Sequence, residues 1–344
     1  MSALFKNDLF KIAFYFLSVV ALGAALAPPL FFGCKNLAAT GLLQGSQWHL
    51  VRELGRILGE TNIQRYFNRA ILAAALLCLI PLIRSLRIKD RSVKDPSRFG
   101  RVFGGFAMGA GILLTMGWGF VFTGVFEPRP EAERESLLSI FQTAIVAGVA
   151  VGLIEEFFFR GMILGICSRT TRRGLALFFV SALYSAVHFL KPPDQIRIPD
   201  AEVMWTTGFW LTGKIFSAFT DPGFLLAEFT TLFAVGWVLG TARLLTGSLW
   251  VSIGMHAGFV FSLKTFAALT KRAMPLEQSL PWIGGDLKIG VVPLLAVIAT
   301  GWLVNLWLRN SPVGAPGGYA AAPGTRGGRR SSLGGSRGSS VSSR

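Results

Sequence analysis

Two adjacent glutamates, Glu155 and Glu156, lie inside an apolar stretch, and Arg160 follows one helical turn later. A charged side chain at the centre of a membrane helix costs about 3 kcal/mol on insertion scales, so such residues are rare, turned inward and functional as a rule. Two of the three histidines in the chain, His188 and His256, also lie in apolar stretches. Carboxylates and imidazoles in such surroundings indicate a buried hydrolytic or metal-binding centre.

Helical spacing gives the two glutamates different roles. Glu156 and Arg160 are four residues apart, so they share one helix face and are predicted to form an ion pair. Glu155 points about 100° away and lacks that partner. An unpaired carboxylate in an apolar cavity needs a histidine or a metal nearby to stay ionised, and such a group suits a general base that takes a proton from water. His188 could orient that water or bind a metal; His256 could do the same or donate a hydrogen bond to a developing oxyanion.

The segments that carry these side chains are predicted to place them at one depth in the membrane. Glu156, His188 and His256 each lie 13 to 15 residues from a basic residue at the cytoplasmic end of their segment. At 1.5 Å per helical residue, each would lie roughly 20 Å from that end. We therefore expect three separate helices to bring polar groups within reach of one another.

The composition is that of a membrane protein. Of 344 residues, 52% are hydrophobic and only 15% are charged, with a mean hydropathy of +0.53. The net charge of +16 lies mainly in short loops and the C-terminal tail, as the positive-inside rule requires, so we expect membrane lipid and no nucleic acid as a partner. The three cysteines include no CxxC pair and predict neither a thiolate zinc site nor a disulfide framework.

We expect an all-α, polytopic transmembrane helix bundle of about eight spans with both termini cytoplasmic. The spans are predicted at about residues 9–32, 67–83, 102–126, 138–166, 174–190, 224–245, 248–266 and 289–308. Pro28 and Pro29 interrupt the first span near its end, and the Gly105/Gly109 spacing in the third allows a close helix approach. An aromatic-rich loop, residues 191–223, predicts an interfacial or re-entrant helix.

The chain divides into four parts by these patterns. Residues 1–137 hold the first three spans, residues 138–266 hold the four spans with the candidate site, and residues 267–310 hold the last span. Residues 311–344 are rich in Gly, Ser and Arg and are predicted to be disordered. The basic loop at residues 84–101 is predicted to be cytoplasmic and sets the orientation of the spans. The oligomeric state is left open.

Three short motifs resemble those of a known family. The segment from Glu155 to Arg160 resembles the EExxxR signature of the CAAX-protease and bacteriocin-processing (CPBP) family, also called the type II CAAX prenyl endopeptidase family. Tyr184 to His188 resembles its second motif, FxxxH, with tyrosine in place of phenylalanine. His256 resembles the histidine of its third motif, HxxxN. The motifs follow one another in the family's order, within predicted spans.

This resemblance implies an intramembrane protease, an endopeptidase that hydrolyses a peptide bond of a membrane-associated protein or peptide. It implies that Glu155 activates water with the help of His188. Glu156 and Arg160 would support the site, and His256 would bind the oxyanion or share in metal ligation. It also implies a multi-pass protein of the bacterial inner (cell) membrane.

Two features leave alternatives open. Glu155, His188 and His256 could hold zinc, but a metal-free glutamate mechanism is equally compatible, and no HExxH motif is present. Val260 stands where the third motif has asparagine, so a second oxyanion donor is missing. Val260 favours an alternative function, a non-catalytic membrane immunity or binding protein of the same fold. A proton-coupled transporter is a third hypothesis, although the sequence shows no internal repeat of the kind transporters often have.

Overall fold

Helices form nearly all of the structure, a computed structural model that describes residues 8–86, 98–130, 136–192, 196–224 and 228–310. The α-helices are α1 (Asp8–Ala39), α2 (His49–Glu60), α3 (Ile63–Ser85), α4 (Arg98–Phe122), α5 (Leu137–Glu156), α6 (Leu164–Thr170), α7 (Arg173–His188), α8 (Thr207–Ala218), α9 (Pro222–Phe224), α10 (Thr230–Thr246), α11 (Trp250–Leu269), α12 (Leu276–Ser279) and α13 (Val291–Asn310). A π-helical turn, η3 (Phe157–Ile163), joins α5 to α6, and a 3-10 turn, η4 (Asp200–Glu202), precedes α8. Strands β1 (Phe126–Pro128) and β2 (Thr270–Arg272) pair antiparallel, with Glu127 opposite Lys271. The predicted all-α fold is confirmed.

Six helices are long and apolar enough to cross a membrane by length and composition: α1, α3, α4, the continuous helix Leu137–Thr170, α11 and α13. Two of the eight predicted segments form shorter apolar helices, α7 and α10. Their 16 and 17 residues reach about 25 Å, less than the roughly 30 Å of a hydrocarbon core. Large apolar side chains are exposed along the long helices, as lipid-facing surfaces require. The number of crossings and the side on which each terminus lies stay predictions.

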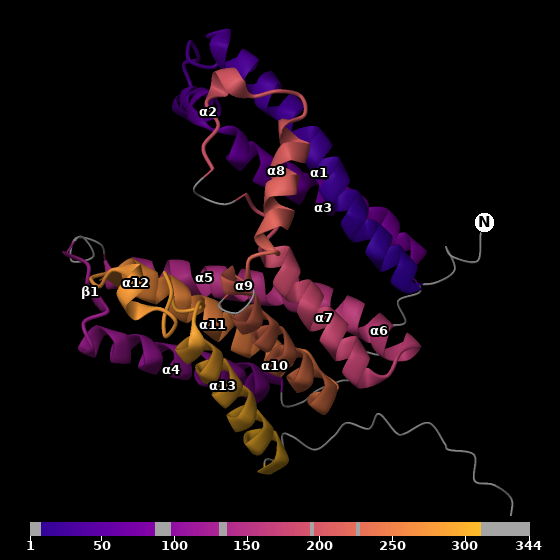
Figure 1. Ribbon diagram of the computed structural model, residues 1–344, viewed down its shortest axis with the longest axis vertical. Coiled ribbons are helices and arrows are strands. Elements are labelled where there is room, and N and C mark those ends of the chain that lie inside the picture. Colours follow the sequence, from indigo (N-terminus) through magenta and orange to yellow (C-terminus); the bar gives the residue numbers. More distant parts are fainter. Residues whose placement is uncertain (1–7, 87–97, 131–135, 193–195, 225–227, 311–344) are drawn as a thin grey trace, which may run out of the picture.

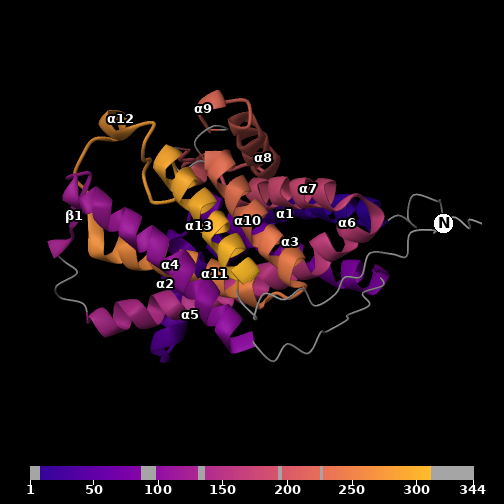
Figure 2. The same ribbon diagram turned by 90° about the horizontal axis from the view of Figure 1, so that it is seen from below.

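Helix α11 is the centre of the bundle. In its most apolar window 67% of the residues are buried, against 22–28% in the other five long helices. It lies between α4 and α5, and α10 and α13 cover another side (Figures 1 and 2). Glycines let these backbones come close: a Cβ at Gly109 of α4 would lie 2.5 Å from the Met255 carbonyl oxygen, and one at Gly148 of α5 would lie 2.6 Å from that of Ala257. The close approach predicted for the α4 glycines is confirmed.

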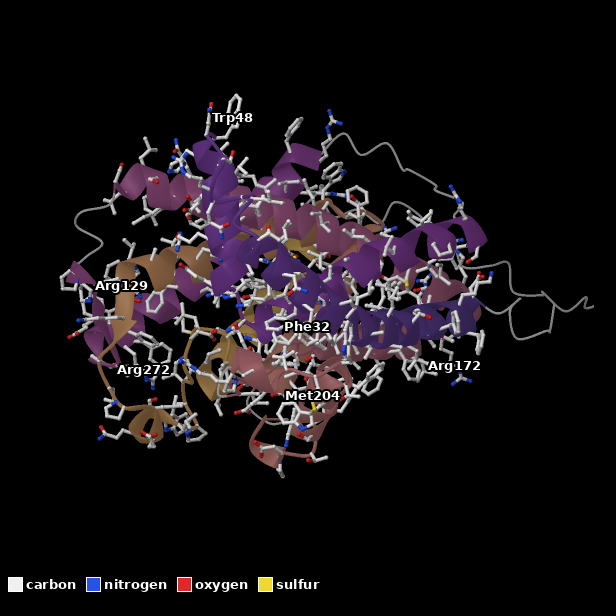
Figure 3. All side chains as sticks on the ribbon, turned by 90° about the horizontal axis from the view of Figure 1, so that it is seen from above. Phe32, Trp48, Arg129, Arg172, Met204 and Arg272 are labelled. Atoms are coloured by element: carbon white, nitrogen blue, oxygen red, sulfur yellow. The ribbon has the colours of Figure 1, made fainter. Side chains whose placement is uncertain are left out.

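Helices α1 and α3 form a hairpin that extends away from this bundle (Figure 1). Helix α8 packs along α1, and α2 lies at the far end of the hairpin. The loop before α8 also contacts the hairpin, where the Phe32 and Trp205 rings lie 4.9 Å apart; Phe32 and the neighbouring Met204 are labelled in Figure 3. At its other end, the hairpin shares an apolar core with η3, α6 and α7 that includes Tyr15, Phe159 and Tyr184. The hairpin thus buttresses the helices that carry the site.

The structure differs from the sequence-based expectation at three places. Helix α1 continues through Pro28 and Pro29 to Ala39, so the predicted interruption is wrong. The regular α-helix of the sixth span, α10, begins at Thr230, and residues 228–229 before it are π-helical. Residues before the second span, for which no helix was predicted, form the amphipathic helix α2, which begins after the exposed Trp48 (Figure 3).

Three other predicted segments are a helix within residues 191–223, the tail and the basic loop. The helix expected within residues 191–223 is present as α8. The tail at residues 311–344 and most of the basic loop, residues 87–97, lie outside the described residues.

Candidate active site

The two glutamates lie where an α-helix changes into a π-helical turn. Helix α5 ends at Glu156, and η3 carries the chain from Phe157 to Ile163 before α6 begins. A π-helical turn is rare and is found frequently at functional sites, since it shifts the direction of the side chains that follow. Here it lies within the segment that holds Arg160, so the helix changes its hydrogen-bond pattern at the centre of the first motif.

Glu156 and Arg160 form the buried base of the site. The Arg160 guanidinium donates to Glu156 Oε1 at 2.8 Å, and the two side chains are 1% and 0% exposed, so the predicted ion pair is confirmed. The same Glu156 oxygen accepts a hydrogen bond from His256 Nδ1 at 2.9 Å, which links α5 to α11. A second Arg160 nitrogen donates to the Gly236 carbonyl oxygen of α10 at 3.2 Å. One carboxylate and one guanidinium therefore hold three helices in a fixed relation.

Glu155 lies above this base and is still accessible, with 27% of its side chain exposed. Its Oε2 atom lies 3.8 Å from His188 Nε2 and 3.7 Å from His256 Nε2. Both separations are too long for direct hydrogen bonds but suit a bridging water. Among the described residues, this oxygen has no hydrogen-bond partner although it is buried. Glu155 thus presents an oxygen without a hydrogen-bond partner to both imidazoles.

The Nε2 atoms of both histidines lie near Glu155 Oε2. His188 Nδ1 lies 2.7 Å from the Tyr184 carbonyl oxygen, and His256 Nδ1 lies 2.9 Å from Glu156 Oε1. Both neighbours are acceptors, so each Nδ1 carries the hydrogen, and in a neutral imidazole the Nε2 is then an acceptor. A carbonyl or carboxylate that fixes a histidine in this way also fixes the orientation of its ring.

The same three atoms test the zinc hypothesis. Two ligands on a tetrahedral zinc with bonds of about 2.0 Å lie about 3.3 Å apart. The carboxylate oxygen and each imidazole nitrogen are farther apart than that, at 3.8 and 3.7 Å. In the described parts of the chain, no group of three or more His, Cys, Asp or Glu side chains is arranged to hold a metal ion. The three groups in this arrangement are spaced more widely than zinc ligands, so the metalloprotease assignment is unsupported and zinc binding stays an untested hypothesis.

Val260 leaves the position one turn after His256 on α11 without a polar group. It lies one turn after His256, on the same face, and is half-buried. The nearby hydroxyls on this helix are engaged elsewhere: Ser252 donates to the Leu249 carbonyl, and Ser262 donates to the carbonyls of Ala110 and Gly258. Helix α11 therefore offers the site His256 and no amide donor.

Residues 137–262 match the family model described as Type II CAAX prenyl endopeptidase Rce1-like. The chain carries an Rce1-like segment. The family resemblance predicted from the motifs is confirmed, and the matched residues include every side chain of the site described above. No curated protein and no solved structure matches the chain. The Rce1-like segment coincides closely with the predicted core at residues 138–266.

The structure brings together all five predicted site residues, whose roles in catalysis stay predictions: Glu155, Glu156, Arg160, His188 and His256. The sequence-based analysis gave no role to Tyr184, although it lies one turn before His188. Its hydroxyl is 3.5 Å from His256 Nε2, and the Arg160 guanidinium lies 4.4 Å from the centre of its ring. Its place in the second motif was the signal, because the family's phenylalanine has no hydroxyl.

Proposed function

We propose that this protein is an intramembrane endopeptidase that cleaves a membrane-associated protein or peptide with a water activated by Glu155. The observation that carries this proposal is the position of Glu155 Oε2, which faces two imidazole nitrogens and has no other partner among the described residues. The family match supports it, because the matching model describes an endopeptidase family. Membrane lipid surrounds the enzyme, and a bacterial cell membrane is the location we propose.

The reaction needs no group beyond those of the site. Glu155 takes a proton from water while His188 Nε2 accepts a hydrogen bond from the second water hydrogen. The hydroxide oxygen bonds to the carbonyl carbon of the scissile peptide, and negative charge develops on the carbonyl oxygen. Glu155 then gives its proton to the leaving nitrogen, the C–N bond breaks, and a carboxylic acid and an amine form; the acid passes its proton to the amine, so a carboxylate and an ammonium group are released. Glu156 and Arg160 keep His256 in place throughout.

A cleavage assay in proteoliposomes tests this function, with lipid-anchored, internally quenched peptides as substrates. Glu155→Gln is nearly isosteric but cannot take the proton, and His188→Ala removes the imidazole that orients the water. A general base contributes roughly 10²–10⁴-fold to the rate, so we expect kcat to fall by that range in Glu155→Gln. His49→Ala is the matched control, since His49 is exposed on α2, away from the site. Undiminished cleavage by both site variants would refute the proposal.

Val260 favours a second function, that of a non-catalytic immunity or binding protein. An active site without an amide donor one turn after the histidine has lost one stabilising contact to the oxyanion, worth about 10²–10³-fold in rate. Under this alternative, Glu155→Gln keeps full biological activity in cells while wild-type protein cleaves no peptide. The two functions therefore give opposite results with one variant.

A further inference from the structure

Tyr184 occupies a fully enclosed position between the two histidines. It is 2% exposed. Its ring packs against Arg160 on one side and edge-on against Phe159, with ring centres 5.2 Å apart. On α10, a Cβ added to Gly236 would lie 3.2 Å from Tyr184 Cδ1, so this backbone also confines the ring. The phenol therefore has little freedom, and its hydroxyl is held in one place.

The atoms of Glu155 and of the two histidines that face one another in the site are acceptors. Glu155 Oε2 is a carboxylate oxygen, and Nε2 of His188 and of His256 are lone pairs in the neutral rings. With its Nδ1 hydrogen directed at Glu156, His256 can donate to an oxyanion through Nε2 only when the ring carries a second proton, and the oxyanion role predicted for it from the sequence stays a prediction. Tyr184, an O–H donor, has its hydroxyl 3.5 Å from His256 Nε2. This contact is at the outer limit of a hydrogen bond, so the hydroxyl proton is available to a stronger acceptor.

The chain lacks an amide donor at the neighbouring position. Val260 offers only methyl groups on the face of α11 that holds His256. A negative oxygen that forms beside His256 therefore meets no side-chain donor from that helix. The phenol on α7 approaches His256 Nε2 from another helix and is neutral, so it can serve without a change of protonation.

We propose that Tyr184 is a catalytic residue whose hydroxyl donates a hydrogen bond to the oxyanion formed at the scissile carbonyl. The proposal rests on the endopeptidase function proposed above. The hydroxyl keeps its proton, and no bond to Tyr184 forms or breaks. Its hydrogen bond strengthens as negative charge develops on the carbonyl oxygen, which lowers the barrier rather than improving the binding of substrate. The tyrosine thus supplies the donor that Val260 does not.

Tyr184→Phe tests the proposal, because it deletes the hydroxyl and keeps both the ring and the backbone carbonyl that orients His188. We expect kcat to fall by about 10²–10³-fold, with KM changed by less than about twofold. Tyr66→Phe is the matched control: Tyr66 is 3% exposed, and its hydroxyl donates to the Leu58 carbonyl, away from the site. A second measurement uses a phosphinic analogue of the peptide that wild type cleaves fastest. Its tetrahedral anion should bind Tyr184→Phe about 10²-fold more weakly.

The outcomes separate this proposal from the function on which it rests. If Glu155→Gln abolishes cleavage and Tyr184→Phe leaves kcat within twofold of wild type, the role of Tyr184 is wrong and the endopeptidase function stands. Equal losses in Tyr184→Phe and Tyr66→Phe, or a rise in KM with kcat unchanged, show a structural or binding role and also overturn it. If wild type cleaves none of the peptides, or Glu155→Gln cleaves them as wild type does, both proposals fall.

Discussion

Removal of Arg160 should destabilise the protein more than any surface charge does, because it leaves a buried carboxylate without its cation. In Arg160→Met, Glu156 loses a 2.8 Å ion pair at a site that is 0% exposed, and the Gly236 carbonyl loses a donor. Breaking a buried pair by removal of one partner costs about 3–5 kcal/mol. The guanidinium also leaves the Tyr184 ring, where a cation–π contact contributes roughly 0.5–2 kcal/mol. Glu156 and Arg160 lie on one helix, so their pair can also form in an unfolded state that keeps this helix, and the variant then destabilises both states. We therefore expect the free energy of unfolding to fall by about 3 kcal/mol, the lower end of that range.

The measurement is the free energy of unfolding in mixed detergent micelles, followed by tryptophan fluorescence. The double variant Glu156→Gln/Arg160→Met removes the orphaned charge, and we expect it to be about 1–2 kcal/mol more stable than Arg160→Met, the usual size of such a coupling. Arg56→Met is the control: Arg56 pairs with Glu53 and Glu60 on the exposed α2, where loss of an ion pair has no measurable effect. The reasoning is refuted if Arg160→Met unfolds at the same free energy as Arg56→Met, or if the double variant is the least stable of the three.

Two further predictions concern the central helix and the metal. Gly258→Leu should prevent a folded bundle or destabilise it by several kcal/mol, because even a Cβ at this position would lie 2.5 Å from the Phe106 carbonyl oxygen. Gly111→Leu on α4 is the control, since its side chain meets open space, and this variant should unfold like wild type. Thermal unfolding in detergent compares the two variants. Purified protein should contain no stoichiometric zinc by elemental analysis, and 1,10-phenanthroline should not reduce cleavage. The reason is that the Glu155–histidine separations are wider than those between zinc ligands. One zinc per chain together with inhibition by the chelator would contradict this prediction.

The sequence predicted those parts of the site that depend on spacing along one helix or on depth in the membrane. The Glu156–Arg160 pair follows from a separation of four residues. The meeting of Glu156 with His256 follows from their matched distances to the basic residues near one end of each segment. The hydrogen bond between Glu156 and His256 fixes the tautomer of the imidazole. The tautomer could not be predicted from the sequence, because hydropathy carries no information on it. The tautomer in turn decides whether His256 can donate to an oxyanion.

What the sequence did not predict depends on the rotation of one helix against another. The Tyr184 hydroxyl meets His256 only because α7 and α11 turn these faces toward each other, and no local pattern encodes that angle. The π-helical turn at Phe157–Ile163 is a shift in backbone hydrogen bonds within a uniformly apolar run, so periodicity does not reveal it. Helix α2 is a different case, because Leu50, Leu54 and Ile57 have helical spacing and the pattern was present in the sequence.

In the proposed mechanism, only one of the two adjacent glutamates takes part in the chemistry. Glu156 is paired with Arg160 and accepts a hydrogen bond from Nδ1 of His256, so this carboxylate orients the imidazole. That same hydrogen bond turns the Nε2 lone pair toward Glu155, which makes the centre rich in acceptors. A site of acceptors can hold and deprotonate water, but it cannot stabilise the negative oxygen that the attack creates. In the proposed mechanism, the hydrogen bond that orients His256 therefore leaves the need for a separate donor, which we assign to the phenol of Tyr184.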